Sequence, residues 1–167
     1  DVNGVLTRTF TGMDDGLADP AGGGNDSLYG GAGADFAWGG RGDDAIHGET
    51  GNDFLQGDAG ADVLVGGDGA DRLAGDGSAT TAGTGQGNDS LDGGISTDRL
   101  YGRAGEDTLF GNDGNDTLNG GTGNDSLRGG NGNDVFEISS GSDTFNGSAG
   151  TDRIVAVANN AVLVIGD

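Results

Sequence analysis

The sequence predicts an all-β fold, a parallel β-solenoid of tandem nonapeptide repeats, because three residue types recur in one nine-residue frame. With Asp26 taken as position six, aspartate fills fourteen of the fifteen sixth positions. Every eighth position, from Leu28 to Ile154, is apolar. Glycine fills the first position of twelve repeats and every fourth position except those of Ser78 and Ser96. Self-similarity at a fixed period is typical of solenoid architectures, in which each repeat stacks on its neighbours.

The composition alone would indicate a disordered acidic chain. The 167 residues include 40 glycines, one proline, 28 acidic residues and seven basic residues, all arginine, and the net charge is −21. Low hydrophobicity with high net charge is typical of intrinsic disorder. A random coil, however, has no reason to keep an apolar residue at every ninth position, so we favour a folded repeat whose carboxylates are neutralised by dissolved cations. So acidic a chain is expected to repel nucleic acid and anionic lipid.

Several absences narrow the possible classes of protein. The chain has no cysteine, which excludes disulfides and thiolate metal sites. No apolar run approaches the ~20 residues of a membrane-spanning helix, so we expect no membrane span. The motifs HExxH and GxSxG are absent and there is a single histidine. We therefore expect no enzyme activity in this chain, and any catalytic domain would lie outside it.

Positions seven to nine of each repeat predict a short β-strand. They read x-U-x, with U a large apolar residue, and the side chains of such a triplet alternate outward, inward and outward. One three-residue strand cannot stand alone. Stacked copies would form a parallel sheet, and two facing sheets would bury the eighth-position side chains as a thin core.

The first six positions predict a turn that can face a cation. Glycine at positions one, two and four permits positive φ and a close approach of the backbone to a ligand, and position six adds a carboxylate. Calcium takes six to eight oxygen ligands, of which one such turn supplies only about half, so a second turn must supply the rest. Asparagine at position five, as in Asn25 and Asn52, is expected to form the turn by adopting the left-handed conformation; a ligand role is the alternative.

The consensus GGxGxDxUx resembles the nonapeptide of the RTX (repeats-in-toxin) family, the hemolysin-type calcium-binding repeat. The match covers residues 21–155. The resemblance implies a right-handed parallel β-roll in which two repeats make one turn of the coil. It also implies calcium ions between same-side turns, two repeats apart, so that Asp35 pairs with Asp53 and Asp107 with Asp125. Each ion would bind carbonyls from positions one and three, or two and four, together with the aspartates of both turns.

The resemblance thus implies two sets of calcium ligands. The carboxylate ligands are the sixth-position aspartates: Asp26, Asp35, Asp44, Asp53, Asp62, Asp71, Asp89, Asp98, Asp107, Asp116, Asp125, Asp134, Asp143 and Asp152. The carbonyl ligands come from the glycine-rich turns: Gly30, Gly31, Ala32, Gly33, Gly39, Gly40, Arg41, Gly42, Gly48, Thr50, Gly51, Gly57, Ala59, Gly60, Gly111, Asn112, Asp113, Gly114, Gly120, Gly121, Thr122, Gly123, Gly129, Gly130, Asn131 and Gly132.

The number of same-side aspartate pairs depends on one irregular repeat. If residues 75–83 form a regular repeat, the pairs number 11, and if these residues loop out, the parity of the later repeats shifts and the pairs number 12. We favour the looped-out arrangement, because Gly75–Gly83 lacks both the fourth-position glycine and the aspartate. Eleven divalent ions would carry a charge of +22, close to the −21 of the chain.

We expect three segments. Residues 1–20 form an N-terminal cap or linker, residues 21–155 form the β-roll repeats, with a possible looped-out insertion at 75–85, and residues 156–167 form a C-terminal capping strand that continues into a longer protein. Repeat arrays need atypical ends. The N-terminal acidic residues could complete a terminal ion site, although a solvated loop is favoured: Asp14, Asp15 and Asp19.

Outward positions carry the few aromatic residues. Phe36, Trp38 and Phe54 are expected on one sheet, where they could bind a polysaccharide or a partner; packing against the N-terminal segment is the favoured alternative. His47 is expected at the surface. The seventh-position arginines are expected to form solvated salt bridges with neighbouring acidic turns: Arg72, Arg99 and Arg153.

The sequence therefore predicts a calcium-dependent folding module. The resemblance implies a secreted or cell-surface protein that leaves a bacterium unfolded through the type I secretion machinery and folds in extracellular calcium. The expected partners are calcium ions, that machinery and the flanking domains of the parent protein. Two alternatives stay open. The chain could be the C-terminal module of a secreted metalloprotease, lipase or alginate epimerase, or a structural segment of an adhesin or S-layer protein.

Overall fold

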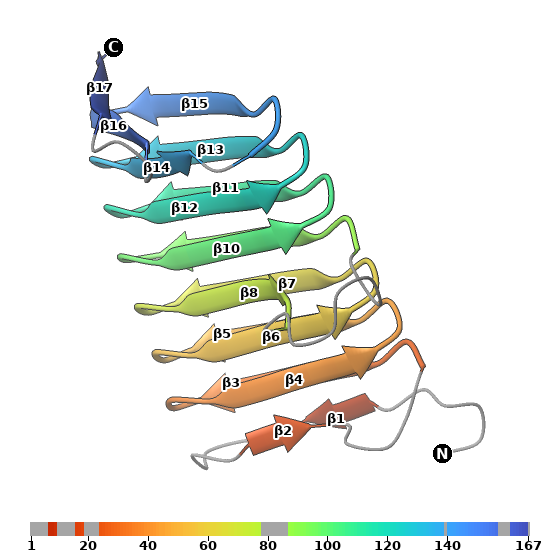
Figure 1. The fold of residues 1–167 in the computed structure, drawn as a ribbon. Coiled ribbons are helices and arrows are strands. Elements are labelled where there is room, and N and C mark those ends of the chain that lie inside the picture. The colour runs from red at the N-terminus through yellow and green to blue at the C-terminus, as the bar shows by residue number, and fades with distance from the viewer. Residues whose placement is uncertain are drawn as a thin grey trace.

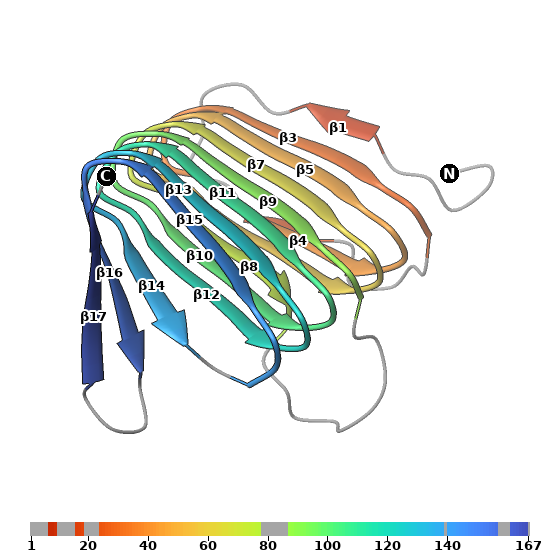
Figure 2. The same cartoon turned by 90° about the horizontal axis from the view of Figure 1, so that it is seen from above.

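A computed structural model describes residues 7–9, 16–18, 24–77, 87–138, 140–156 and 161–166. In these ranges the chain contains only strands, turns and bends (Figure 1). Two sheets face each other, and up to β16 the chain passes from one to the other after each strand (Figure 2). The two views together show a right-handed coil, because the strands facing the viewer in Figure 1 run to the right while the coil rises. The chain is therefore a right-handed parallel β-roll.

The strands alternate between the two sheets along the chain. Sheet A contains, in spatial order, β1 (Thr7–Thr9), β3 (Ser27–Ala32), β5 (Ala45–Thr50), β7 (Val63–Asp68), β9 (Ser90–Ile95), β11 (Thr108–Asp113), β13 (Ser126–Asn131) and β15 (Thr144–Ala149). Sheet B contains, from its N-terminal end, β2 (Gly16–Ala18), β4 (Phe36–Arg41), β6 (Phe54–Ala59), β8 (Arg72–Asp76), β10 (Arg99–Ala104), β12 (Thr117–Thr122), β14 (Val135–Ile138), β16 (Thr151–Ala156) and β17 (Ala161–Gly166).

Most strands are twice as long as the three residues that the repeat predicts. β11 spans positions seven to nine of one repeat and positions one to three of the next. The second and third positions also pair with the neighbouring coil, as in Asn112 with Gly130 and Asp113 with Asn131. The expectation of three-residue strands is therefore wrong. The ladder uses backbone groups only, so it continues through positions whose side chains give no hydrophobic signal.

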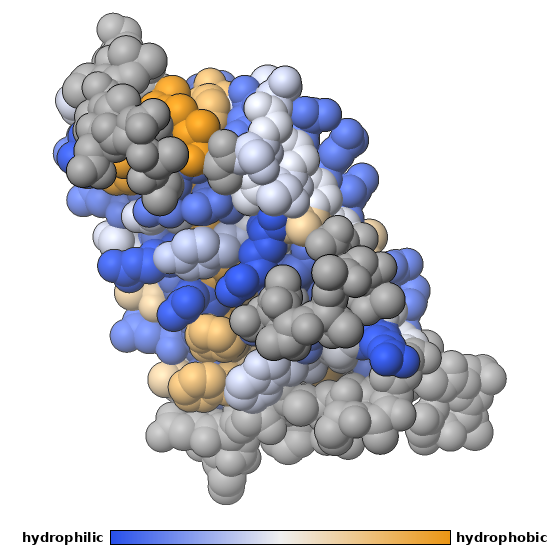
Figure 3. All heavy atoms as spheres, in the orientation of Figure 1, coloured by the Kyte–Doolittle hydropathy of each residue, from blue (hydrophilic) through white to orange (hydrophobic). Residues whose placement is uncertain are grey.

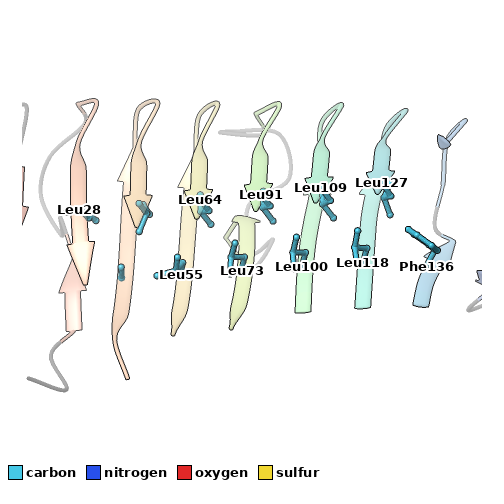
Figure 4. Close-up of a cluster of buried hydrophobic side chains, with 12 residues drawn as sticks. Leu28, Leu55, Leu64, Leu73, Leu91, Leu100, Leu109, Leu118, Leu127 and Phe136 are labelled. Carbon is cyan, nitrogen blue, oxygen red and sulfur yellow. The ribbon is translucent and has the colours of Figure 1, made fainter. Parts of the chain in front are cut away.

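The core is a double column of eighth-position side chains. Leu28, Leu64, Leu91, Leu109 and Leu127 lie in one row, and Leu55, Leu73, Leu100, Leu118 and Phe136 lie in the facing row (Figure 4). These residues are at most 2% exposed. Phe145 and Ile154 extend the core as partly buried residues. Each fully buried apolar side chain contributes about 1.5–3 kcal/mol, and stacking of the repeats is what buries these side chains.

From β3 to β16 the pairing register changes once. Neighbouring strands of a sheet in this part pair at a spacing of 18 residues, as in Ile46 with Leu64, whereas β7–β9 and β8–β10 pair at a spacing of 27. At the N-terminal end, β1–β3 and β2–β4 pair at a spacing of 20. Gly75 and Asp76 still belong to β8, and Gly77 donates its N–H to the carbonyl of Asp58. The interruption therefore follows position three of this repeat, which is later than the boundary expected at residue 75. Residues 78–86 lie outside the described part.

The two ends of the roll differ. β1 and β2 pair in parallel with β3 and β4, so each sheet is extended by one strand at the N-terminal end. At the C-terminal end β17 pairs antiparallel with β16 (Figure 1). This hairpin interrupts the parallel stacking of sheet B. Asp14, Asp15 and Asp19, considered for a terminal ion site, lie outside the described residues.

Candidate metal centre

The sixth-position aspartates lie in the turns that precede the strands, in two columns at opposite edges of the roll. Thirteen of them are at most 3% exposed, and Asp143, in the last repeat of sheet A, is half-buried. A carboxylate is costly to bury unless it is paired or bound to a metal ion. Nearly every strand of the roll begins one residue after an aspartate. When the strands stack in register, their aspartates therefore stack as well.

In twelve of these aspartates one carboxylate oxygen links successive coils. The backbone N–H of Asp35 donates to Oδ1 of Asp53 at 2.9 Å, and that of Asp107 donates to Oδ1 of Asp125 at 2.9 Å. Twelve such bonds form two columns of six: Asp26–Asp44–Asp62–Asp89–Asp107–Asp125–Asp143 and Asp35–Asp53–Asp71–Asp98–Asp116–Asp134–Asp152. The structure thus brings together the pairs that the sequence predicts for the arrangement with 12 pairs.

The second oxygen of these carboxylates has no hydrogen-bond donor in nine of the buried aspartates. It points to the first-position glycine of its own repeat. A Cβ placed on Gly93 would lie 2.6 Å from Oδ2 of Asp98 and 3.0 Å from the carbonyl oxygen of Gly111, which belongs to the next coil. A side-chain-free space with two or more oxygens around it is thus repeated along each edge. The nine aspartates are Asp53, Asp62, Asp71, Asp89, Asp98, Asp107, Asp116, Asp125 and Asp134.

The glycines of the turn serve two different purposes. Gly31 and Gly33, at positions two and four, have φ of 104° and 123°, a conformation that L side chains rarely adopt. First-position glycines such as Gly30 and Gly93 do not need positive φ; they are required because a Cβ would fill the space next to the carboxylate. The expectation that all three glycines provide conformational freedom therefore holds for positions two and four only.

Burial and mutual repulsion disfavour the charged form of these carboxylates. Desolvation is the main cause that raises the pKa of Asp62 to about 7, of Asp98 to about 7 and of Asp89 to about 8. The charge of a neighbouring carboxylate adds to each shift, and the backbone N–H donor opposes it. Two columns of buried carboxylates therefore require either protons or cations.

The available ligands are all oxygens, which fits calcium. Among the described residues no three or more acidic, histidine or cysteine side chains converge as a metal-binding group, so a cation between two aspartates must take its other ligands from carbonyls. Calcium accepts six to eight oxygens, including backbone carbonyls. The unbonded Oδ2 atoms and the carbonyls that face them, such as that of Gly111 beside Asp98, are suitably placed donors.

Position five forms a second ladder between coils. Oδ1 of Asn52 accepts the N–H of Ala70, and Oδ1 of Asn133 accepts the N–H of Thr151, at 2.9 and 2.8 Å. In these bonds the later coil donates to the earlier one, whereas in the aspartate bonds the earlier coil donates to the later one. Neighbouring turns are therefore linked by hydrogen bonds in both directions. No position-five asparagine has positive φ within the described ranges, so the expected left-handed turn role is wrong.

Sequence reasoning missed Asp76, because it occupies position two of the interrupted repeat. It is 6% exposed, and its Oδ2 accepts the N–H of Ala104 at 3.1 Å. Desolvation raises its pKa most, while the charge of Arg103 lowers it. Asp76 therefore ties β8 to β10 at the point where the chain leaves the ladder. The only signal in the sequence is an acidic residue in a repeat that otherwise lacks aspartate.

The described part of the chain has no helix long and apolar enough to cross a membrane. A family model for the RTX calcium-binding nonapeptide repeat (4 copies) matches residues 20–55, 47–81, 84–109, 110–137 and 139–160. No curated protein matches the chain.

Proposed function

Because the chain belongs to the RTX family of calcium-binding nonapeptide repeats, we propose that it is a module that folds on binding extracellular calcium. The observation that carries this proposal is the double column of buried aspartates. Nine of their Oδ2 atoms lack a donor, and seven of these nine lie in a space that a carbonyl oxygen of the next coil also borders. Calcium would supply the missing positive charge at these oxygens. We assign one ion to each same-side aspartate pair, which gives 12 ions along the two columns.

The residues that would hold each ion come from two coils. For the pair Asp98–Asp116, they are the two carboxylates, the carbonyl of Gly111 and further carbonyls of the turns that begin at Gly93 and Gly111. Twelve divalent ions carry a charge of +24, which exceeds the −21 of the chain by 3. Binding therefore removes the repulsion that otherwise opposes compaction.

Calcium binding and folding are coupled, because every site is made of two coils and does not exist in the unfolded chain. Cytosolic calcium is micromolar or lower, and extracellular modules bind calcium with Kd of about 10⁻⁴–10⁻³ M. The chain would thus stay extended inside a cell and fold outside it. This supports passage through type I secretion machinery, location in a secreted or cell-surface protein, and stabilisation of the flanking domains of the parent protein.

The repeat itself is a structural calcium-binding module. An enzyme that carries it would have its active site outside Asp1–Asp167, and an adhesin or S-layer protein would use it as a segment of a rigid stalk. The sequence on either side of the roll distinguishes these two alternatives.

Far-ultraviolet circular dichroism during a calcium titration, starting from chelator, tests the proposal. We expect a cooperative gain of β signal with calcium and none with magnesium, because magnesium requires a small octahedral site and keeps its water. A chain that is fully folded in chelator at neutral pH would contradict the coupling of calcium binding to folding.

A further inference from the structure

Two arginines lie side by side on the outer face of sheet B. Arg72 of β8 and Arg99 of β10 are register partners, although 27 residues separate them in the sequence. Both are exposed. No carboxylate of the described residues forms an ion pair with either guanidinium, so the salt bridges expected for these arginines are absent. Like charges at facing positions of a sheet are destabilising, and in a chain of net charge −21 this pair is conspicuously without acidic partners.

Aromatic rings hold one of these arginines in place. The guanidinium carbon of Arg72 lies 5.4 Å from the ring centre of Phe54 and 5.6 Å from that of Tyr101. Contact with two rings fixes the plane of the guanidinium, while its N–H groups stay free to donate. An arginine held in this way suits bidentate recognition of a carboxylate or sulfate group.

An aromatic cluster continues the same face toward the N-terminal end. The ring centres of Phe36 and Trp38 are 6.1 Å apart, and those of Phe36 and Phe54 are 6.0 Å apart. Phe36 is 47% exposed. β2 pairs with the edge of β4 and so extends the sheet beside this cluster. Figure 3, which shows the outer face of sheet B, has pale orange and white residues near the N-terminal end and deep blue residues over the middle strands.

Acidic residues are scarce around the two arginines. At the outward seventh and ninth positions of the central strands of sheet B, β4 to β16, the single acidic residue is Glu137, whose carboxylate accepts a hydrogen bond from Asn119 at 2.9 Å. The second-position row carries Asp58, bonded to Gln56, and the buried Asp76, which lies beside Arg103. The outer face of sheet B thus combines cations and aromatic rings in an otherwise acidic molecule.

We propose that this face binds an anionic saccharide. A carboxylate or sulfate group of one sugar residue binds Arg72 and Arg99, and a neighbouring pyranose ring lies against the aromatic cluster of Phe36, Trp38 and Phe54. The proposal rests on the calcium-loaded fold, in which the bound ions reverse the net charge of the chain. Calcium then has two effects on this site: it aligns β8 with β10, and it removes the repulsion of an anionic ligand.

Trp38 is the single tryptophan of the chain and lies within the proposed site, so its fluorescence reports binding. The calcium-loaded chain is titrated with a short oligogalacturonate, a sulfated oligosaccharide, a neutral malto-oligosaccharide, inorganic sulfate and anionic phospholipid vesicles, each also followed by calorimetry. Two variants, Arg72→Gln and Arg99→Gln, are compared with Arg128→Gln, which removes the same charge from the exposed face of β13 in sheet A. Circular dichroism of every sample in calcium shows whether the roll is folded.

We expect saturable binding of at least one anionic oligosaccharide. If the oligogalacturonate binds more tightly, the group recognised is a carboxylate; if the sulfated oligosaccharide binds more tightly, it is a sulfate. Loss of one charge-assisted contact should weaken binding about ten- to a hundredfold in Arg72→Gln and Arg99→Gln, with little change in Arg128→Gln. A folded chain that binds no anionic oligosaccharide overturns the proposal. The proposal is also overturned if the neutral sugar or inorganic sulfate binds with the same affinity as the charged oligosaccharides. Binding of the vesicles without binding of any oligosaccharide overturns it too. A chain that fails to fold in calcium instead contradicts the proposed function.

Discussion

Ten of the sixth-position aspartates would each belong to two of the proposed ion sites, because they lie between two other aspartates in their column, whereas the four at the column ends would belong to one. Oδ1 of Asp116 accepts the N–H of Asp98, and the N–H of Asp116 donates to Oδ1 of Asp134. Its Oδ2 has no donor. The two oxygens thus have separate roles, one in linking the coils and one in the proposed binding of calcium.

Substitution Asp116→Asn tests this division. Asparagine keeps an acceptor for the N–H of Asp98 but removes the charge, so we expect the calcium stoichiometry to fall by up to two ions and the folding midpoint to move to higher calcium. Calorimetry and atomic absorption after dialysis measure the stoichiometry. Asp68→Asn, at an exposed third position, is the matched control and should keep all ions. Unchanged stoichiometry in Asp116→Asn would contradict the assignment of position six.

Protons should partly replace calcium. The raised pKa of Asp62, about 7, and of Asp89, about 8, means that the metal-free roll binds protons more tightly than the unfolded chain, whose aspartates titrate near their ordinary value. The stability of the metal-free roll should therefore be lost as pH rises through about 7–8 and be greatest below the ordinary aspartate pKa. Circular dichroism of calcium-free protein should show β signal increasing from pH 8 to pH 4. A signal that decreases on acidification would refute this.

At the scale of the strand, the roll accommodates an interruption between β8 and β9 without loss of strand pairing or of the aspartate columns. β8 ends at Asp76 and β9 begins at Ser90, yet the ladders on both sides continue with the aspartate pairs Asp62–Asp89 and Asp71–Asp98. Gly75 takes the first position of the interrupted repeat, since its Cβ would contact Oδ2 of Asp89 and the carbonyl oxygen of Gly102. Gly87 takes the fourth position, facing the carbonyl of Gly60.

Two deletions of equal length distinguish the interruption seen in the structure from the one expected from sequence. Removal of residues 78–86 joins position three to position four, so we expect unchanged calcium stoichiometry. We also expect a stability gain of about 2 kcal/mol, because fewer residues then connect Gly77 with Gly87. Removal of residues 75–83 places Thr84 at position one, where a Cβ would crowd Asp89. That variant should lose calcium at this coil. Calcium titrations and thermal melts compare the two, and equal behaviour would contradict the placement of Gly75.

At the scale of the whole molecule, the roll consists of neighbour contacts only. Each coil packs against the one before and the one after it, and the core is one apolar side chain per repeat. Such a thin core cannot by itself offset the ordering of so many glycines, because glycine loses the most backbone entropy on folding. The shape of the molecule therefore depends on the ions proposed for its two edges.

Small-angle X-ray scattering should show this dependence directly. For 167 residues, the radius of gyration should fall from about 43 Å in chelator to about 15–16 Å in calcium, with self-repulsion adding to the first value. Magnesium at the same ionic strength is the control and should leave the chain expanded. A compact chain in both conditions would show that the carboxylates are tolerated without ions.

The nine-residue period by itself determined the β-roll, its core column and its aspartate columns, because each repeat is a local unit whose spacing is written in the sequence. It also favoured the arrangement with 12 aspartate pairs. The length of the strands was not visible, since backbone pairing at glycine positions leaves no side-chain signal. Only the stacking decided that Oδ2 faces a carbonyl of the next coil, that Gly75 stays within the ladder, and that Arg72 meets Arg99 beside Phe54 and Tyr101. These are contacts between residues 18 or 27 positions apart, and they depend on the register in which the coils stack.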